Sequence, residues 1–151
     1  MSIVSLTYSK INAEKTKPIQ GKVNVVNNVA IKNVEKVNFI VGSVKQDSLK
    51  FSFEFTSKTE PEIGSILIEG DVIFLVESGD AEKVVSDWKE KKPVNKDIVA
   101  PVINGILRKC NVEALIMSQT MNLPAPIKLP SVSAAEAMGK NSISSSENSD
   151  N

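Results

Sequence analysis

The chain has 151 residues, 41% of them hydrophobic, a length and composition that suit one domain of ordinary size. Its 18 basic residues balance 18 acidic ones, so the chain has no net positive charge to attract nucleic acid. Arg108 is the only arginine, so the bidentate guanidinium contacts that phosphates favour are scarce. The chain has no histidine and one cysteine, Cys110, which leaves no histidine base, no intramolecular disulfide and no thiolate metal cluster. We therefore expect no enzyme activity, no metal and no cofactor.

The N-terminus and the apolar runs indicate where the protein is located. The start, Met1-Ser-Ile-Val, has neither a basic region nor a long apolar region, and so does not resemble a signal peptide. The longest apolar run, 72–76, is far shorter than the roughly twenty residues of a membrane helix. With one unpaired thiol, which suits a reducing interior, we expect a cytoplasmic protein with no membrane insertion.

The first half of the chain has the period-two pattern of β-strands. The pattern is clearest over 49–55, where leucine and three phenylalanines alternate with polar residues. Four other strands are predicted over 3–11, 22–32, 34–45 and 63–76. We expect a bulge or turn at Val26-Asn27, where the alternation changes phase, and an interruption at Gly70-Asp71. The short links between the strands favour antiparallel hairpins.

The apolar spacing changes to that of α-helices after Gly79. Asp80 is predicted to cap a short helix that stops at Lys92-Pro93. A longer helix is predicted from Asp97 or Ile98 to Gln119, with Pro101 in its first turn, where a missing N–H costs little, and Asn122 as its stop. Strands followed by helices indicate an α+β fold with the helices on one side of the sheet.

The segment Leu123 to Pro130 is unusually apolar for a loop, and its prolines lower the entropy cost of an extended conformation. Three arrangements are open: the segment packs along the edge of its own sheet, meets another subunit, or walls a groove. From Ser131 the composition becomes polar and predicts disorder. We therefore predict a single domain over 1–130 and a disordered tail over 131–151.

Isolated polar and aromatic residues add few candidates for chemistry. The carboxylate pairs at 60/62 and 69/71 fall at turn positions, where solvation is the default. Cys110 lies on an apolar helix stripe, as a small core residue would. Trp88, the only tryptophan, is predicted to anchor its helix in the core, with an aromatic wall of a binding groove as the alternative.

The order of elements resembles the SecB-like family of bacterial protein-export chaperones, best over 63–129. The sequence Ile98-Val99-Ala100-Pro101 is similar to the apolar-apolar-x-Pro opening of that family's main helix, and Arg108-Lys109 falls near its basic part. The Leu-Pro-Ala-Pro-Ile at 123–127 is similar to the segment that follows that helix. The resemblance implies a four-stranded antiparallel sheet with two helices packed on one side. It also implies a homo-oligomer, dimer or tetramer, acting as an ATP-independent holdase in protein export.

On this hypothesis, apolar grooves bind unfolded or precursor polypeptides. The residues predicted to contact polypeptide are Phe74, Trp88, Leu123, Pro124, Ile127 and Leu129. The residues predicted to form an oligomer interface are Ile98, Val102 and Ile106. The alternative is a non-catalytic oligomeric adaptor or assembly module of the same fold, in which the segment after the long helix only seals a subunit interface.

Overall fold

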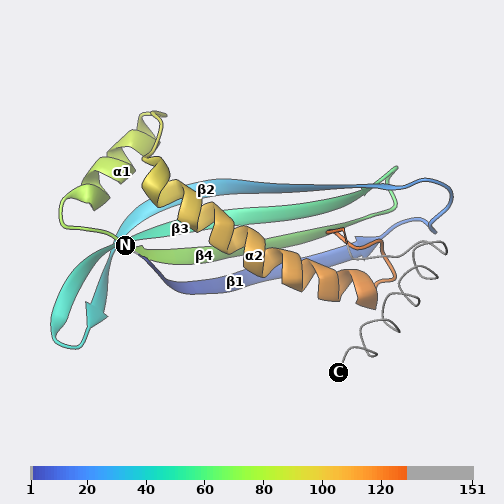
Figure 1. Ribbon diagram of the computed structural model, residues 1–151, viewed down its shortest axis with the longest axis horizontal. Helices are drawn as coiled ribbons and strands as arrows, with labels where there is room; N and C mark the ends of the chain where they lie inside the picture. The colour runs from blue at the N-terminus through green and yellow to red at the C-terminus, as the bar shows by residue number, and fades with distance from the viewer. Residues whose placement is uncertain (1, 129–151) are drawn as a thin grey trace, which may run out of the picture.

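The computed structural model describes residues 2–128, which form four β-strands followed by two α-helices. The elements are β1 (Ser2–Lys15), β2 (Asn24–Val41), β3 (Val44–Glu60), β4 (Gly64–Leu75), α1 (Asp80–Lys89) and α2 (Lys96–Thr120). All four strands form one antiparallel sheet in the order β1-β4-β3-β2, and both helices lie on one of its faces (Figure 1). The predicted α+β fold, a four-stranded antiparallel sheet with two helices packed on one side, is confirmed.

The long strand β2 replaces two of the predicted strands. A register shift between Ile31 and Asn33 absorbs the change of phase, so the pairing with β3 continues through it. The predicted irregularity at Val26-Asn27 is therefore wrong, because both residues pair with β3 without a shift. β2 ends at a two-residue turn, Gly42-Ser43, in which Gly42 has a φ of 64° that favours glycine.

The predicted interruption of β4 at Gly70-Asp71 is also wrong. Gly70 pairs with Tyr8 on one side and Phe53 on the other, within an unbroken strand. A Cβ atom at Gly70 would clash with the Thr7 carbonyl oxygen and would lie 2.9 Å from the ring carbon Cζ of Phe53. Glycine is present here because neighbouring strands approach closely, not because the strand ends.

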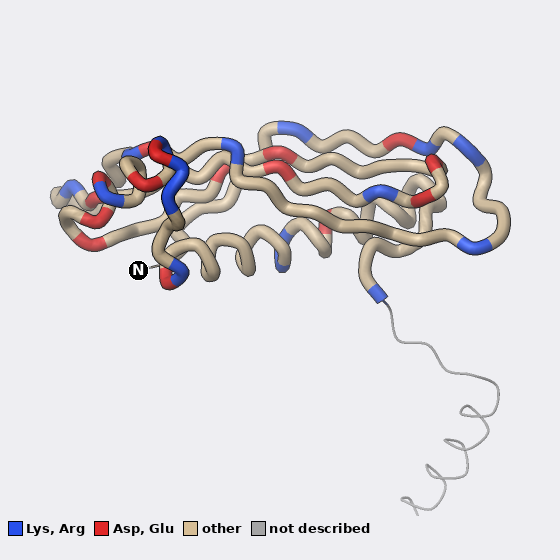
Figure 2. Tube along the Cα trace, turned by 90° about the horizontal axis from the view of Figure 1, so that it is seen from above, with Lys and Arg blue, Asp and Glu red and all other residues tan. Residues whose placement is uncertain are grey.

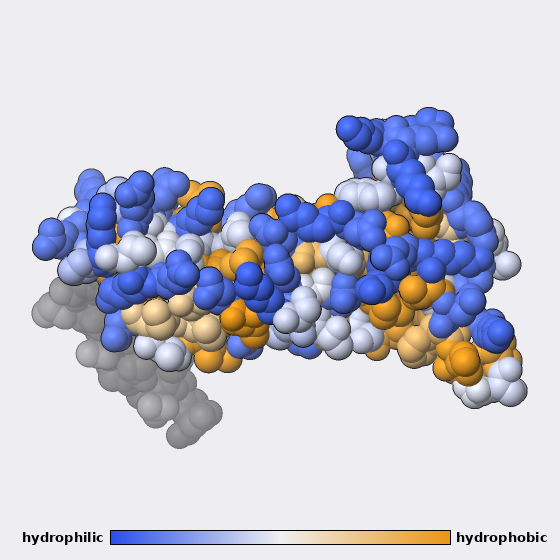
Figure 3. Space-filling model, turned by 180° about the vertical axis from the view of Figure 1, so that it is seen from behind, coloured by the Kyte–Doolittle hydropathy of each residue, from blue (hydrophilic) through white to orange (hydrophobic). Residues whose placement is uncertain are grey.

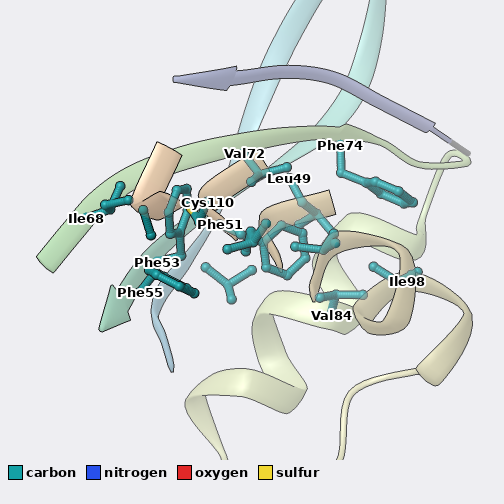
Figure 4. Packing of buried hydrophobic residues seen from close by; sticks show 14 of the residues in the cluster. Leu49, Phe51, Phe53, Phe55, Ile68, Val72, Phe74, Val84, Ile98 and Cys110 are labelled. Atoms are coloured by element: carbon teal, nitrogen blue, oxygen red, sulfur yellow. The ribbon is translucent and has the colours of Figure 1, made fainter. Parts of the chain in front are cut away.

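The core lies between the sheet and the two helices. Alternate side chains of β3 and β4 point toward the helices, and the rings of Phe51, Phe53 and Phe55 form its centre (Figure 4). Helix α2 contributes one buried residue at every fourth position: Ile98, Val102, Ile106, Cys110, Ala114 and Ser118. Four residues rotate an α-helix by about 400° rather than a full turn, so this buried line winds around α2. Such a line suits a helix that crosses the sheet obliquely, as Figure 1 shows.

Helix α2 begins earlier than predicted. The Asn95 side chain accepts a hydrogen bond from the Asp97 backbone N–H at 3.0 Å and caps the helix, which starts at Lys96. Pro101 therefore lies in the second turn instead of the first. Because proline has no N–H, the Asp97 carbonyl four residues earlier lacks its usual intrahelical partner.

The C-terminus of α2 is a Schellman motif. Asn122 has a φ of 54°, the Leu123 N–H donates to the Ser118 carbonyl at 2.8 Å, and the Asn122 N–H donates to the Gln119 carbonyl at 3.3 Å. These bonds satisfy carbonyls that the end of a helix would otherwise leave free. The predicted stop at Asn122 is confirmed.

Helix α1 ends at Lys89, three residues before the predicted stop at Lys92-Pro93. Its N-cap is Gly79, with a φ of 91°, so Asp80 is the first helical residue and not the cap. An ion pair between Lys36 of β2 and Glu82 joins α1 to the sheet. This contact raises the pKa of Lys36 and lowers that of Glu82.

The face of the sheet opposite the helices is mostly hydrophilic (Figure 3). On this face the Ser52 hydroxyl donates to the Asp71 carboxylate at 2.8 Å. The tip of the β2–β3 hairpin differs, since its apolar side chains Ile40, Val41 and Val44 are exposed. Charged residues gather over α1 and the strands, whereas α2 is mostly uncharged (Figure 2). Apart from the hairpin tip, the less charged surface of the molecule is therefore the one along α2.

Among residues 2–128, no helix is both long enough and apolar enough to cross a membrane. The predicted boundary at 130/131 and the predicted tail over 131–151 lie outside the described residues.

Candidate functional site

An apolar groove of about 580 Å³ lies between β1 and α2. Its floor on the β1 side is formed by Ile3, Leu6 and Tyr8, which pair with the inward-facing positions of β4. The α2 side is formed by Gly105, Arg108, Lys109, Val112 and Glu113. The groove is therefore apolar along its floor, with three charged side chains on the helix that borders it.

Helix α2 approaches β1 closely where Gly105 faces Ile3. A Cβ atom at Gly105 would lie 2.5 Å from the Cδ1 atom of Ile3, so glycine allows α2 to approach β1 at this point. One and two turns further along α2, the larger side chains of Lys109 and Val112 line the groove instead. Val112 remains 57% exposed, a large exposed fraction for an apolar side chain on a helix that covers a sheet.

β1 is an edge strand, so one side of its backbone has no partner strand among the described residues. Thr7 pairs with Asp71, and its carbonyl oxygen points toward β4, where it lies against Gly70. Successive carbonyls of a strand point to opposite sides, and the register is continuous from Ser5 to Tyr8. The Leu6 carbonyl therefore faces the free edge, beside the groove.

Lys109 connects α2 to this free edge by three contacts. Its ammonium donates to the Leu6 carbonyl oxygen at 3.0 Å and lies 5.3 Å from the centroid of the Tyr8 ring. The Tyr8 hydroxyl in turn donates to the Lys109 backbone carbonyl at 3.3 Å. A lysine in this position blocks an edge carbonyl that an added β-strand would use.

Two titratable groups beside the groove are held in their neutral forms. Burial, with smaller contributions from Cys110 and Glu113, raises the pKa of Tyr8 to about 12. Burial also raises the pKa of the Cys110 thiol to about 12, so the thiol has little nucleophilic character near neutral pH. The groove thus offers apolar surface and hydrogen-bonding groups but no activated nucleophile. Over residues 2–128, no cluster of three or more His, Cys, Asp or Glu residues could hold a metal ion.

The structure places Phe74 and Trp88 in different environments. Phe74 is 1% exposed and lies in the core, so it does not line a surface groove as predicted. The cause is the alternation of β4, which directs this ring toward the helices. Trp88 is partly exposed near the end of α1, where it borders a separate hollow with Asn33 and lysines of the α1 C-terminal turn. Because Trp88 is partly exposed, its ring could contact a ligand, as the alternative prediction of an aromatic groove wall requires.

The predicted interface residues Ile98, Val102 and Ile106 are no more than 2% exposed in the single chain. They face the sheet, because the apolar stripe of α2 already covers the core of its own domain. This prediction therefore needs correction: these three side chains have no surface to offer another copy. The large aliphatic residues of α2 that are exposed are Val112 and Ile116.

The segment 123–128, which we call the arm, packs on its own sheet. Leu123 is 8% exposed and Pro126 is buried, whereas Pro124 and Ile127 are partly exposed. The Lys15 ammonium donates to the Asn122 carbonyl at 3.1 Å, and the Asn27 side-chain amide donates to the Pro126 carbonyl. The arm thus crosses the end of the sheet from β1 toward β2 (Figure 1). Of the three predicted arrangements the first is nearest to the structure, but these residues cross the end of the sheet instead of following its edge. Leu129 lies outside the described residues.

No local sequence pattern predicted the groove itself. Leu6 and Tyr8 fall within the strand predicted over 3–11, but nothing marked that strand as an edge. The register shift between Ile3 and Ser5 also places Ile3, rather than Val4, on the groove side. The one usable signal was Val112, an apolar residue off the main stripe of its helix.

No protein-family model matches this chain, and no curated protein matches it by sequence. A SecB-like chaperone of Mycobacterium tuberculosis, solved in complex with a ChAD peptide from an antitoxin, is a structural neighbour. The two chains align with a TM-score of 0.44 and 11% sequence identity, over 87% of this chain and 90% of the other. Similarity of this degree does not establish a function, so a functional assignment has to come from the groove.

Proposed function

We propose that this protein is an ATP-independent chaperone that holds unfolded or precursor polypeptides in the groove between β1 and α2. The observation that supports this function is an open apolar groove beside the free edge of a β-strand. An unfolded chain has both exposed apolar side chains and unpaired backbone groups. Burial in the groove would remove the side chains from water, and pairing with β1 would satisfy the backbone.

The residues proposed to contact a client differ from those predicted from the sequence. The groove residues Ile3, Leu6, Tyr8 and Val112 replace Phe74 and the buried arm residue Leu123. Trp88, Pro124 and Ile127 are partly exposed and remain candidates for contacts beyond the groove. The proposed activity is binding alone, without catalysis, and we propose that further copies of the chain assemble into a homo-oligomer.

The test is suppression of aggregation. A model protein unfolded in guanidinium is diluted into buffer with or without this protein, and light scattering follows its aggregation. We expect the wild type to suppress scattering and Val112→Asp to suppress it less, because a carboxylate in the groove opposes the burial of apolar side chains. The matched control is Ile116→Asp, which places the same charge one turn further along α2, outside the groove, at a residue 53% exposed.

Failure of the wild type to suppress aggregation would contradict the chaperone function. An adaptor or assembly module is the second candidate, favoured by the exposure of both Val112 and Ile116 on the same face of α2. For such a module, both substitutions would reduce the molar mass of the oligomer, measured by light scattering after size exclusion, while aggregation of the client would be unaffected by any variant.

A further inference from the structure

We propose that the groove prefers extended apolar segments that contain an acidic side chain, and that Lys109 determines this preference. The inference rests on the proposed function and specifies the class of polypeptide that the groove accepts. The Lys109 ammonium lies between the free edge of β1 and the groove.

Lys109 competes with any strand that pairs with β1. Its ammonium donates to the Leu6 carbonyl, which is the acceptor that the N–H of an added strand would need at that position. Binding of an extended segment therefore displaces the ammonium from this oxygen. The displaced ammonium lies at the Tyr8 ring and needs a new acceptor, because its former one is occupied.

The charges around the groove determine which segments can supply that acceptor. Arg108 and Lys109 are adjacent on α2 and both line the groove, whereas Glu113 is the only acidic residue among the residues that line it. A glutamate of the bound segment would accept from Lys109 and would lie near Arg108. A lysine in the same place would face two cations. A neutral side chain would leave the ammonium to water or to Glu113, one turn further along α2.

The charge of Lys109 can be removed without removing the apolar surface of its side chain. The side chain lies along the groove and against Tyr8, so its methylene groups contribute apolar surface whatever the state of the ammonium. Substitution by methionine keeps a flexible apolar chain of similar length and removes the charge and the donor. Lys109→Met is therefore the variant that tests the preference without emptying the groove.

The experiment measures binding of three short capped peptides by fluorescence anisotropy. The peptides alternate valine and serine and differ only in a central Glu, Gln or Lys. With the wild type we expect the Glu peptide to bind about two- to fivefold more tightly than the Gln peptide, the range of an exposed ion pair, and the Lys peptide to bind most weakly. With Lys109→Met we expect the Glu and Gln peptides to bind nearly equally, because Glu113 in the same groove offsets the remaining charge of Arg108. The Gln peptide should bind at least as tightly as to wild type, because the Leu6 carbonyl is no longer blocked.

The control is Lys83→Met, which removes an exposed charge of α1 outside the groove and should keep the wild-type order. Circular dichroism establishes that each variant is folded. Equal binding of the three peptides to the wild type would overturn this inference while leaving the proposed function intact. A preference for Glu that is undiminished in Lys109→Met would also overturn it. Binding of none of the peptides, together with no suppression of aggregation, would overturn both.

Discussion

Leu123 lies against Gly64, at the point where the arm crosses the start of β4. A Cβ atom on Gly64 would be 2.7 Å from Cδ2 of Leu123 and 2.6 Å from the carbonyl oxygen of Glu14. The close contact between the arm and the sheet therefore depends on the absence of a side chain at residue 64. It also explains why an apolar, proline-containing segment is stable on a single chain: its first leucine is buried against its own sheet.

Gly64→Ala should lower the free energy of unfolding by about 1–3 kcal/mol, because both the Leu123 side chain and the β1 backbone would have to move. Urea denaturation followed by circular dichroism measures this change. The matched control is Ser65→Ala on the opposite face of β4, which should stay within about 0.5 kcal/mol of wild type. Equal stability of Gly64→Ala and wild type would show that the arm does not pack on Gly64 in solution.

Asn122→Ala should destabilise the protein by about 1 kcal/mol, because residue 122 has the positive φ that ends α2, and alanine adopts this conformation less readily than asparagine. Asn122→Gly should be neutral or slightly stabilising, since glycine has no side chain to strain. Urea denaturation of the two variants measures the difference. If both variants have the same stability, the Schellman motif does not determine the end of α2.

Pro101→Ala should stabilise the protein by roughly 1–3 kcal/mol, because alanine supplies the N–H that the Asp97 carbonyl lacks in the second turn of α2. The residue is exposed, so the substitution removes little packing. Thermal unfolding of the variant and the wild type at one protein concentration measures the change. A lower melting temperature would mean that the proline ring contributes a contact to the folded protein, for instance to a second copy.

Alkaline pH should destabilise the protein through Cys110. Burial raises the pKa of its thiol from 9.0 to about 12, so the unfolded chain loses this proton at a lower pH than the folded chain does. The contribution is fully present below pH 9 and is lost as the pH rises from 9 to 12, because proton release then favours unfolding. Tyr8, with its pKa raised from 10.0 to about 12, acts in the same direction.

Urea unfolding at pH values between 8 and 11 measures this dependence. The free energy of unfolding should fall less steeply with pH in Cys110→Ala than in wild type. The variant lacks the Cys110 thiol and keeps the Tyr8 hydroxyl, whose pKa is also raised. The two proteins differ only at residue 110, so the comparison isolates the thiol. Identical slopes would show that the thiol of the folded protein is not protected from ionisation.

Much of the fold follows from patterns within single segments of the chain. The alternation of Leu49, Phe51, Phe53 and Phe55 determines which face of β3 is buried, and the spacing of Ile98, Val102 and Ile106 determines the buried side of α2. Asn122 marks a helix end because few residues tolerate a positive φ. These features depend on side-chain direction and backbone preference, which are properties of neighbouring residues.

The tertiary structure alone decided which apolar residues remain at the surface. The helical stripe that was predicted to join subunits is covered by the sheet of its own domain. The arm packs against Gly64 of β4. In both cases an element far away in the chain covers the apolar residues. The groove exists because β1 is at the edge of the sheet and α2 crosses the sheet obliquely, so that Val112 is left uncovered. Strand order and crossing angle depend on contacts between residues more than a hundred positions apart, such as Lys109 with Leu6, and no local pattern specifies them.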